Sequence, residues 1–356
     1  MKTIIILAWR NLWRNRKRSL ITMSSVLFAV LLSIVFNAME KGSYERMIDG
    51  MVTYGTGYIQ IQDVFYEEEP SMDNSMLFDQ HIHDILDQMD HRISFYVPRI
   101  QNFALVAYGN QTRGSMVMGI DPDKEALMND LSKNLVKGSF LESGDDGIML
   151  AQGLAEIMGI NIGDTLVMLG QGFQGSTAAG QFPVKGIVNL RVPEMNNNTV
   201  YMSLETAQWF YMAEDRLTAL IVMPVNPRQT RRVANEILEI IDREWYNVLT
   251  WDHMMADFLA LMKFDTAGTM LFLLILYVVI AFGLFGTVLT MMIERQREYG
   301  MLISLGMKRP RLAAMSFIES ALISLSGALA GMLAAVPVVA YFQINPITLT
   351  GEMANT

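Results

Sequence analysis

The chain has 356 residues, of which 51% are hydrophobic, and its mean hydropathy of +0.26 is higher than most soluble domains of this size reach. Its formal net charge is −9, and residues 39–265 carry 16 basic and 32 acidic groups, so we expect no nucleic-acid partner. The chain has no cysteine, which excludes disulfides, thiol redox chemistry and thiolate metal sites. The composition therefore predicts a membrane protein with a large acidic extramembrane part.

The N-terminal residues 1–18 carry six basic side chains and no acidic one. Helical spacing would place Trp9, Leu12 and Trp13 on one face and most of the arginines elsewhere. This pattern predicts a helix that lies in the cytoplasmic interface of the membrane. A simple topology anchor is the alternative, and the two interpretations are compatible.

Three apolar stretches predict membrane spans at residues 19–39, 266–293 and 312–342. Each is long enough to cross a hydrocarbon core of about 30 Å as a helix. A cleaved signal peptide is the alternative for the first stretch. It is disfavoured because the preceding segment, rich in Trp and Arg, would be an unusually long leader and no clear A-x-A site follows.

The basic residues predict the orientation of these spans. They cluster in residues 1–18 and in the loop 294–311, which lie on the same side if each apolar stretch crosses once. The positive-inside rule then predicts a cytoplasmic N-terminus, with residues 40–265 and the tail 343–356 outside. The absence of cysteine fits a bacterial envelope protein, so we expect a multi-pass protein of the bacterial inner membrane.

Residues 40–265 mix strand-like and helical patterns, which predicts a large extracytoplasmic α+β domain inserted between the first two spans. Its first and last strands, with their helices, could pair as one subdomain, and residues 98–214 would then be an insertion. The predicted strands are 57–62, 102–108, 115–120, 165–169, 184–188, 199–202 and 219–223, and the predicted helices are 79–89, 150–158, 204–210 and 227–245.

The domain offers weak candidates for ligand sites. Residues 170–180 (GQGFQGSTAAG) contain the spacing G-x-G-x-x-G, but a strand rather than a helix is expected to follow, so we interpret the segment as a loop. His81 and His83, flanked by Asp79 and Asp84, are spaced i, i+2 and would face apart on a helix. A solvated helix start is therefore favoured over a metal site, and His91 and His253 add no identifiable partner.

The chain lacks the motifs that would let it hydrolyse ATP or an ester. It has no G-x-x-x-x-G-K-[ST] phosphate loop and no G-x-S-x-G nucleophile motif, so any ATP and Mg²⁺ used with this chain must bind to a separate subunit. We expect no cofactor on the chain itself. A membrane-anchored enzyme with its active site in residues 40–265 lacks a convincing catalytic constellation.

The second and third spans carry features that suggest contacts with other helices. Residues 251–263 (WDHMMADFLALMK) have helical periodicity and lead into the second span without Gly or Pro, so the span could continue outward as a stiff stalk. Glu319 lies near the cytoplasmic end of the third span, where it could face a protein partner or reach the interface. Gly327 and Gly331 form G-x-x-x-G, which permits close approach of another helix, such as that of a dimer partner.

The loop 294–311 (ERQREYGMLISLGMKRPR) contains more than a turn requires. Glu294, Arg297 and Glu298 are spaced as one charged helical turn that continues the second span. Gly306 is positioned to cap a short helix at its C-terminus, and Pro310 to open the next helix.

An apolar face follows that charged turn. Met301, Leu302 and Leu305 would lie on one side of the short helix. A surface helix with an apolar face and flanking charges is suited to docking into a groove on a soluble partner.

At this point the sequence resembles the FtsX-like permeases of ABC transporters, also called type VII or mechanotransmission transporters. The resemblance rests on AWRNLWRNRKRSLIT, on TWDHM, and above all on MMIERQREYGMLISLGMKR with Glu319 downstream. GLAEIMGINIGDTLVM and VYMSLETAQ are similar to parts of the MacB-like periplasmic core of the family. The resemblance implies that the loop is a coupling helix seated on an ABC ATPase subunit, with these contact or shape-determining residues: Glu294, Arg297, Glu298, Gly300, Leu302 and Gly306.

Within the family the pattern is most similar to the permeases that release lipoproteins from the inner membrane. The resemblance implies a second permease copy or a paralogue as partner, contact with membrane lipid, and a periplasmic lipoprotein carrier. A transmembrane transmitter that controls an envelope hydrolase or sensor without transporting a substrate is the alternative. The family has four spans and this chain contains three, for which a gene fragment is our first explanation.

Overall fold

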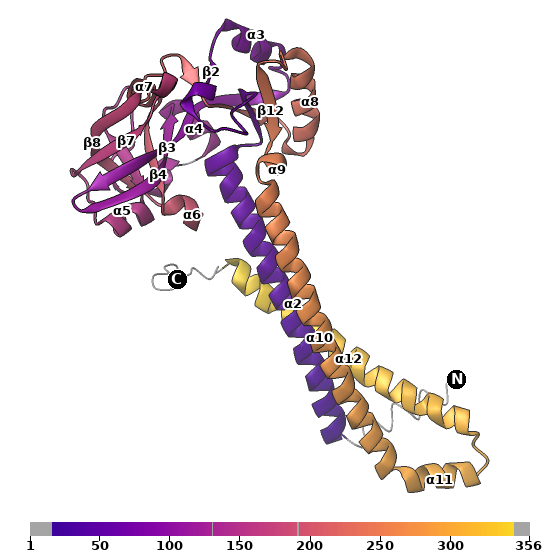
Figure 1. Ribbon diagram of the computed structural model, residues 1–356. Helices are drawn as coiled ribbons and strands as arrows, with labels where there is room; N and C mark the ends of the chain where they lie inside the picture. The colour runs from indigo at the N-terminus through magenta and orange to yellow at the C-terminus, as the bar shows by residue number, and fades with distance from the viewer. Residues whose placement is uncertain (1–15, 130, 191, 345–356) are drawn as a thin grey trace. The chain divides into compact units, whose positions relative to one another are not determined.

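The computed structural model describes residues 16–344 except 130 and 191 (Figure 1). The chain divides into two compact units, one formed by Met1–Glu45 with Ala260–Thr356 and the other by Arg46–Leu259. We call the described part of the first the helical unit and the second the extramembrane unit. The expected interfacial helix at residues 1–18 falls almost entirely outside the described residues, as does most of the tail 343–356.

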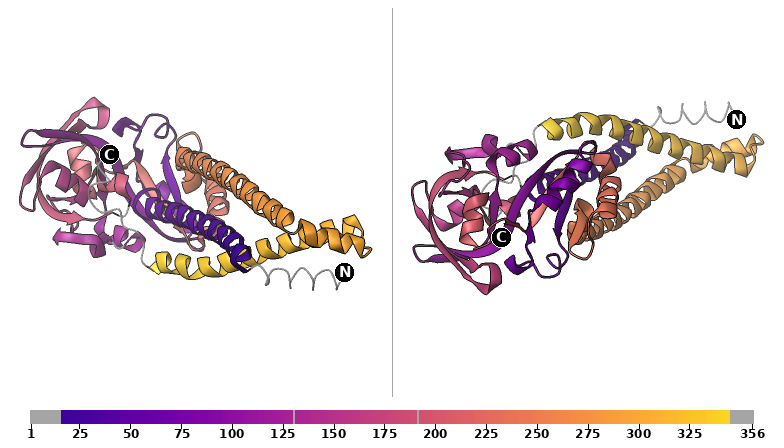
Figure 2. Two further views of the ribbon diagram at one scale, coloured as in Figure 1. Left: turned by 90° about the horizontal axis from the view of Figure 1, so that it is seen from below. Right: turned by 90° about the horizontal axis from the view of Figure 1, so that it is seen from above.

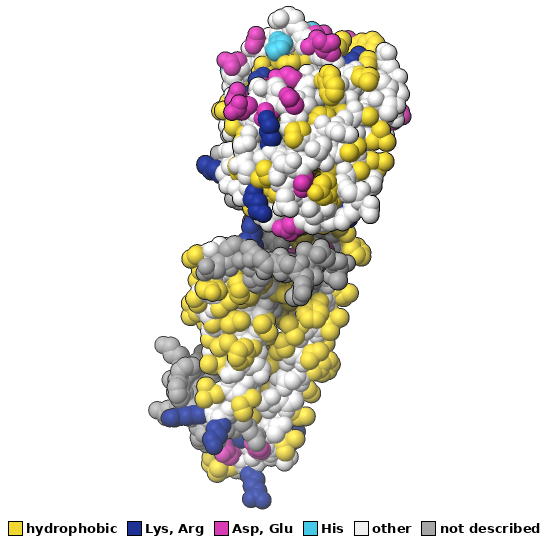
Figure 3. All heavy atoms as spheres, turned by 90° about the vertical axis from the view of Figure 1, so that its left-hand side faces the viewer, with side chains coloured by type: hydrophobic (Ala, Val, Ile, Leu, Met, Phe, Trp, Pro, Cys, Tyr) yellow, Lys and Arg dark blue, Asp and Glu magenta, His cyan; other side chains and the backbone are white. Residues whose placement is uncertain are grey.

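Three long apolar helices are confirmed among the described residues. The first is α2 (Arg16–Met51), which continues as the π-helical turn η1 (Val52–Thr56), the second is α10 (Ala256–Glu294), and the third is α12 (Arg309–Ile344). Their most apolar 18-residue windows have mean hydropathies of 2.3, 2.7 and 2.1. Hydrophobic side chains accordingly cover the surface of the helical unit in Figure 3, and Lys, Arg, Asp and Glu side chains gather at its lower end.

The predicted stalk before the second span is divided. Trp251–Met254 forms a separate turn, α9, and α10 begins at Ala256 after Met255 leaves the helical conformation. From Ala256 onward the helix runs unbroken through the predicted span to Glu294, as the continuous ribbon in Figure 2 shows.

The extramembrane unit has the predicted α+β fold. Its main sheet has the strand order β12-β1-β11-β3-β4-β9-β6-β8-β5, and β7 pairs with both β3 and β8. β4 runs parallel to β9 and β6 runs parallel to β8, whereas the other pairs are antiparallel. The strands are β1 (Ile59–Asp63), β3 (Ile93–Tyr108), β4 (Gln111–Ile120), β5 (Leu135–Gly138), β6 (Ile148–Ala151), β7 (Thr165–Gln171), β8 (Thr177–Val188), β9 (Thr199–Ser203), β11 (Ala219–Pro224) and β12 (Tyr246–Thr250), with β2 (Met76–Leu77) and β10 (Arg216–Leu217) as a separate pair.

Short helices connect these strands, and several begin at side-chain caps. The side chains of Asp79, Asp121 and Ser203 accept backbone hydrogen bonds at the starts of α3, α4 and α7. The helices are α3 (Gln80–Gln88), α4 (Pro122–Met128), α5 (Gln152–Met158), α6 (Pro193–Asn196), α7 (Leu204–Phe210) and α8 (Thr230–Ile240), with one-turn segments η2 (Met72–Asn74), η3 (Leu131–Asn134), η4 (Phe173–Gly175) and η5 (Pro227–Gln229).

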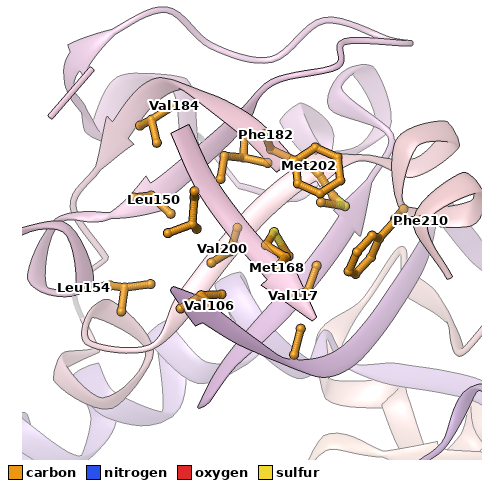
Figure 4. Packing of buried hydrophobic residues seen from close by; sticks show 14 of the residues in the cluster. Val106, Val117, Leu150, Leu154, Met168, Phe182, Val184, Val200, Met202 and Phe210 are labelled. Atoms are coloured by element: carbon orange, nitrogen blue, oxygen red, sulfur yellow. The ribbon is translucent and has the colours of Figure 1, made fainter. Parts of the chain in front are cut away.

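The hydrophobic core of the extramembrane unit consists of three clusters of buried side chains. One cluster, with side chains from residues 59–93 and 217–248, joins the first and last strands of the unit under α3 and α8. A second cluster extends from Ile100 to Ala213 with Met72, and Figure 4 shows its side chains meeting between β3, β4, β6, β7 and β8. A third cluster joins Tyr54 to side chains from residues 118–201, among them Met118, Ile120 and Tyr201.

Candidate coupling site in the loop between α10 and α12

The loop between α10 and α12 folds as a short helix, α11 (Gln296–Ser304). Arg295 leaves the helical conformation between α10 and α11, so the chain changes direction without a long connection. At the other end, the N–H of Gly306 bonds to the Ile303 carbonyl at 2.9 Å and the N–H of Met307 bonds to the Leu302 carbonyl at 3.0 Å.

These two bonds form a Schellman motif with Gly306 at the C′ position, as expected from its place in the sequence. The φ angle of Gly306 is +93°, which favours glycine. Arg309 and Pro310 then begin α12, so a helical turn, a cap and a new helix follow within a few residues.

The end of α10 and the start of α11 pack against α12, in part through polar groups. Met291, Arg295 and Tyr299 are spaced four residues apart and are buried. Nη1 of Arg295 donates to Oε1 and Oε2 of Glu319 at 3.0 and 3.2 Å. The Tyr299 hydroxyl lies 3.5 Å from Oγ of Ser316. The two side chains of this ion pair are only 8% and 4% exposed. Because the pair is buried and joins the start of α11 to α12, it fixes α11 against α12.

The opposite face of α11 is open and apolar. Met301 is 59% exposed on this face, and Leu305, which follows the helix, is 79% exposed. Among the residues that the family resemblance implies, Glu294, Arg297, Gly300 and Gly306 are exposed, and Glu298 and Leu302 are half-buried. The structure therefore brings these six residues together on one short loop, and Leu305 extends their apolar surface.

Sequence reasoning missed two residues of this site. Arg295 and Tyr299 hold the loop in place, whereas the charged turn predicted from the sequence consists of Glu294, Arg297 and Glu298. The repeat of Met291, Arg295 and Tyr299 at i, i+4 could have indicated a buried face. Glu319 contacts Arg295 of its own chain. Of the two alternatives predicted for Glu319, the structure therefore shows a contact within the protein.

The glycines of α12 also find their partner within the chain. A Cβ atom at Gly327 would lie 2.7 Å from the carbonyl oxygen of Met23, and one at Gly331 would lie 2.7 Å from that of Leu27. The G-x-x-x-G face is therefore filled by α2, and the dimer contact that the motif suggested is not required to explain it. Other buried residues continue this stripe along α12 at intervals of four: Met315, Glu319, Ile323 and Ala335.

The weaker sequence candidates have structural roles. G-x-G-x-x-G forms a β7–β8 hairpin through η4, and a strand follows it, as expected for a loop. The ring of His83 packs 4.4 Å from that of Phe78, and His253 Nε2 lies 2.8 Å from Oε1 of Glu67. Among the described residues, no group of three His, Asp or Glu side chains is arranged to hold a metal ion.

Comparison with protein families covers most of the chain. The model of the MacB-like periplasmic core domain matches residues 19–240, and that of the FtsX-like permease C-terminal region matches residues 270–354. The chain belongs to the FtsX-like permeases with a MacB-like core. As a member of this family it is the permease subunit of an ABC transporter, and the loop at α11 lies within the matched C-terminal region.

Named relatives of this permease are distant. The lipoprotein-releasing system transmembrane protein LolC of Neisseria meningitidis serogroup B is 23% identical over 354 residues, which cover 93% of this chain and 81% of that protein. LolC of Xylella fastidiosa strain Temecula1 is also 23% identical, over 70% of this chain and 62% of its own length.

Solved structures related to this permease include the periplasmic region of MacB from Actinobacillus actinomycetemcomitans. It aligns with a TM-score of 0.41 and 14% identity, over 60% of this chain and 97% of that one. The extracellular domain of the ABC-type transporter YknZ from Gram-positive bacteria aligns with a TM-score of 0.39 and 13% identity, over 55% of this chain and 100% of that one.

Proposed function

We propose that this permease couples ATP hydrolysis by a separate ABC ATPase subunit to a conformational change in its extramembrane unit, and that the transported substrates are lipoproteins. The ATPase binds ATP and Mg²⁺, and the permease chain binds neither. A second permease copy or a paralogue completes the membrane part, and a periplasmic carrier receives the substrate.

The observation that carries the coupling proposal is the construction of α11. Its open face presents Met301 and Leu305 beside the exposed guanidinium-bearing side chain of Arg297. An exposed apolar helix face of this kind is stabilised when it is buried in a partner groove. The pair of Arg295 and Glu319 holds that face in a fixed orientation, so a force applied to α11 reaches α12 directly.

Two further observations support the orientation and the substrate. Arg297, Lys308, Arg309 and Arg311 are exposed around α11, which by the positive-inside rule favours a cytoplasmic loop and hence a cytoplasmic N-terminus. Lipoprotein release is favoured because the named relatives are lipoprotein-releasing transmembrane proteins.

The test is ATPase activity in a purified complex of the permease with its partner. We expect Arg297→Glu combined with Leu305→Asp to remove most of the permease-dependent stimulation, because the substitutions reverse a charge and bury a carboxylate at the docking face. Leu305 is preferred to the half-buried Leu302 because its replacement leaves the packing of α11 unchanged. Full stimulation by this variant would contradict the coupling assignment.

A matched control carries the same chemical changes in the extramembrane unit. Arg113 is exposed and Leu127 is 62% exposed, so Arg113→Glu with Leu127→Asp should preserve stimulation.

Depletion of the permease in cells tests the substrate. Lipoproteins retained in the inner membrane support release, whereas normal lipoprotein sorting with a defect in an envelope hydrolase would favour a signal transmitter.

A further inference from the structure

The end of the first long helix is anchored in the extramembrane unit by buried side chains. α2 ends at Met51 and continues as the π-helical turn η1, after which Gly57 turns the chain into β1 with a φ of +64°. The last carbonyls of a helix have no partner within it and carry the negative end of its dipole. In this chain those carbonyls are bound by a side chain of β3 and by that of Asn129, the C-cap residue of α4.

Arg99 is the centre of this anchor. Its Nη1 donates to the carbonyls of Tyr54 and Gly55 at 3.3 and 2.5 Å. Its Nε donates to Oε2 of Glu125 at 2.9 Å, and its Nη2 donates to the other oxygen of the same carboxylate. Neither side chain of this ion pair is exposed to solvent.

Asn129 completes the anchor. Its Nδ2 donates to the carbonyl of Thr53 at 3.3 Å and to Oε1 of Glu125 at 2.5 Å. Three consecutive backbone carbonyls at the end of the helix are thus held by two side chains. We refer to Arg99, Glu125 and Asn129 as the η1 clamp.

The η1 clamp joins the helix to the middle of the main sheet. Arg99 belongs to β3, where it lies opposite Ala219 of β11 on one side and Ile120 of β4 on the other. A strand with neighbours on both sides cannot shift without breaking two ladders of hydrogen bonds. A movement of η1 should therefore move β3 and its neighbouring strands with it.

The clamp is unlike the contacts around the second helix. α9, which precedes α10, is tied by His253 to Glu67 and by Asp252 to Arg231, and the side chains of His253 and Arg231 are 59% and 81% exposed. Exposed ion pairs are screened by solvent and stabilise weakly. A buried ion pair gives no advantage in stability over apolar side chains of similar size, so its value lies in the geometry that it specifies.

We propose that Arg99 is a positioning residue that transmits movement of α2 into the extramembrane unit. The inference rests on the proposed function, since it assumes that the membrane helices move when the partner ATPase works. It predicts that loosening the η1 clamp separates ATP hydrolysis from lipoprotein release. The ATPase would still be stimulated through α11, but the extramembrane unit would no longer follow.

The main test uses the full permease in complex with its ATPase. Arg99→Met with Glu125→Met removes both charges together, so that no single charge stays buried. We expect stimulated ATPase activity to be retained while the rate of lipoprotein release falls about 5-fold or more, the lower range of typical coupling effects. Arg99→Lys is the second variant, because a lysine can pair with Glu125 but cannot bridge to both carbonyls. If the double variant fails to fold, Arg99→Lys tests the inference in its place, with the same expected loss of release and retention of ATPase stimulation.

The control is another ion pair of the same unit. Arg92 and Glu236 are paired at 3.2 Å and are 29% and 27% exposed, and Arg92→Met with Glu236→Met should leave release unchanged. Unchanged release in the clamp variant, or an equal loss of release and ATPase stimulation, would overturn the inference. An equal loss in the control variant would also overturn it, because the effect would then reflect general destabilisation.

A distance measurement between α2 and α4 separates this inference from the proposed function. The chain has no native cysteine, so Asp49→Cys on α2 and Ala126→Cys on α4 can be spin-labelled at exposed positions. The distance distribution between the labels should broaden when the η1 clamp is removed, and an unchanged distribution would refute the clamp. If the unaltered complex releases no lipoprotein, the proposed function fails. The distance measurement then still shows whether the η1 clamp holds the end of α2 against α4.

Discussion

Arg295 and Glu319, 24 residues apart in the sequence, form a buried ion pair that fixes α11 against α12. Removing one partner breaks this ion pair in a site that is closed to solvent. We expect Arg295→Ala or Glu319→Ala each to lower the free energy of unfolding by about 3–5 kcal/mol, and Arg295→Met with Glu319→Met to lower it less than either. Thermal unfolding of the four proteins in detergent measures the cycle.

A control for this cycle lies two residues away. Arg297 is exposed in the first turn of α11, and Arg297→Ala should change the free energy of unfolding by only about 0.5 kcal/mol or less. If the double methionine variant is as unstable as the sum of the single variants, the ion pair does not hold α11.

The glycines of α12 should be intolerant of side chains. Gly327→Leu or Gly331→Leu would push a side chain into the backbone of α2, so we expect each to destabilise the helical unit by about 1–3 kcal/mol. Gly283 and Gly286 in α10 provide the comparison, because a Cβ atom at either meets nothing within 4 Å. Similar melting temperatures for Gly283→Leu and Gly327→Leu would show that α2 does not pack on α12.

Two glycines of the loop should respond in opposite ways to a methyl group. Gly306 has a φ of +93°, a strained conformation for alanine, so Gly306→Ala should lower stability by about 1–3 kcal/mol. Gly300 lies within α11 in open space, so Gly300→Ala should raise stability by about 0.5–1 kcal/mol. Thermal unfolding of the isolated permease measures both.

ATPase assays on the same two variants add a second readout. If Gly300 contacts the partner, its alanine variant will stimulate the ATPase less despite its greater stability. A Gly306 variant that is as stable as the unaltered permease would contradict the role of the Schellman motif.

Tyr66 makes the extramembrane unit sensitive to alkali. Burial of its ring raises the pKa of Tyr66 to about 12, against the opposing hydrogen bond with Thr218. The stability that the neutral phenol contributes is therefore fully present below its ordinary pKa of about 10 and is lost as the pH rises toward about 12. Tyr66→Phe should release one proton fewer in alkaline unfolding, measured by phenolate absorbance with circular dichroism. An unchanged proton count would refute this role.

Local patterns were sufficient to predict much of this structure. Uncharged length predicted the three long helices, and Gly306 and Pro310 predicted the end of α11 and the start of α12 because caps depend on neighbouring residues. β12 was missed, since Tyr246–Thr250 follows directly on a helical pattern and becomes a strand only by pairing with β1.

Long-range contacts were beyond the reach of the sequence. Gly327 and Gly331 indicated that some helix approaches closely, but only the fold identifies it as α2, about 300 residues earlier in the chain. In the same way the charge of Arg99 gave no hint of its partners, because Glu125 and the carbonyls of η1 lie on different elements.

The pairing of β1 with β12 has a consequence for how a membrane protein can carry so large an insertion. Ile59 lies opposite Thr250, so the chain leaves the extramembrane unit beside the point where it enters. The entropy of closing a loop rises only with the logarithm of its length, so nearly two hundred residues between these strands cost little more than a short loop. Because the two ends of the unit are neighbours, residues between β1 and β12 can be added, removed or exchanged without changing the distance between those ends.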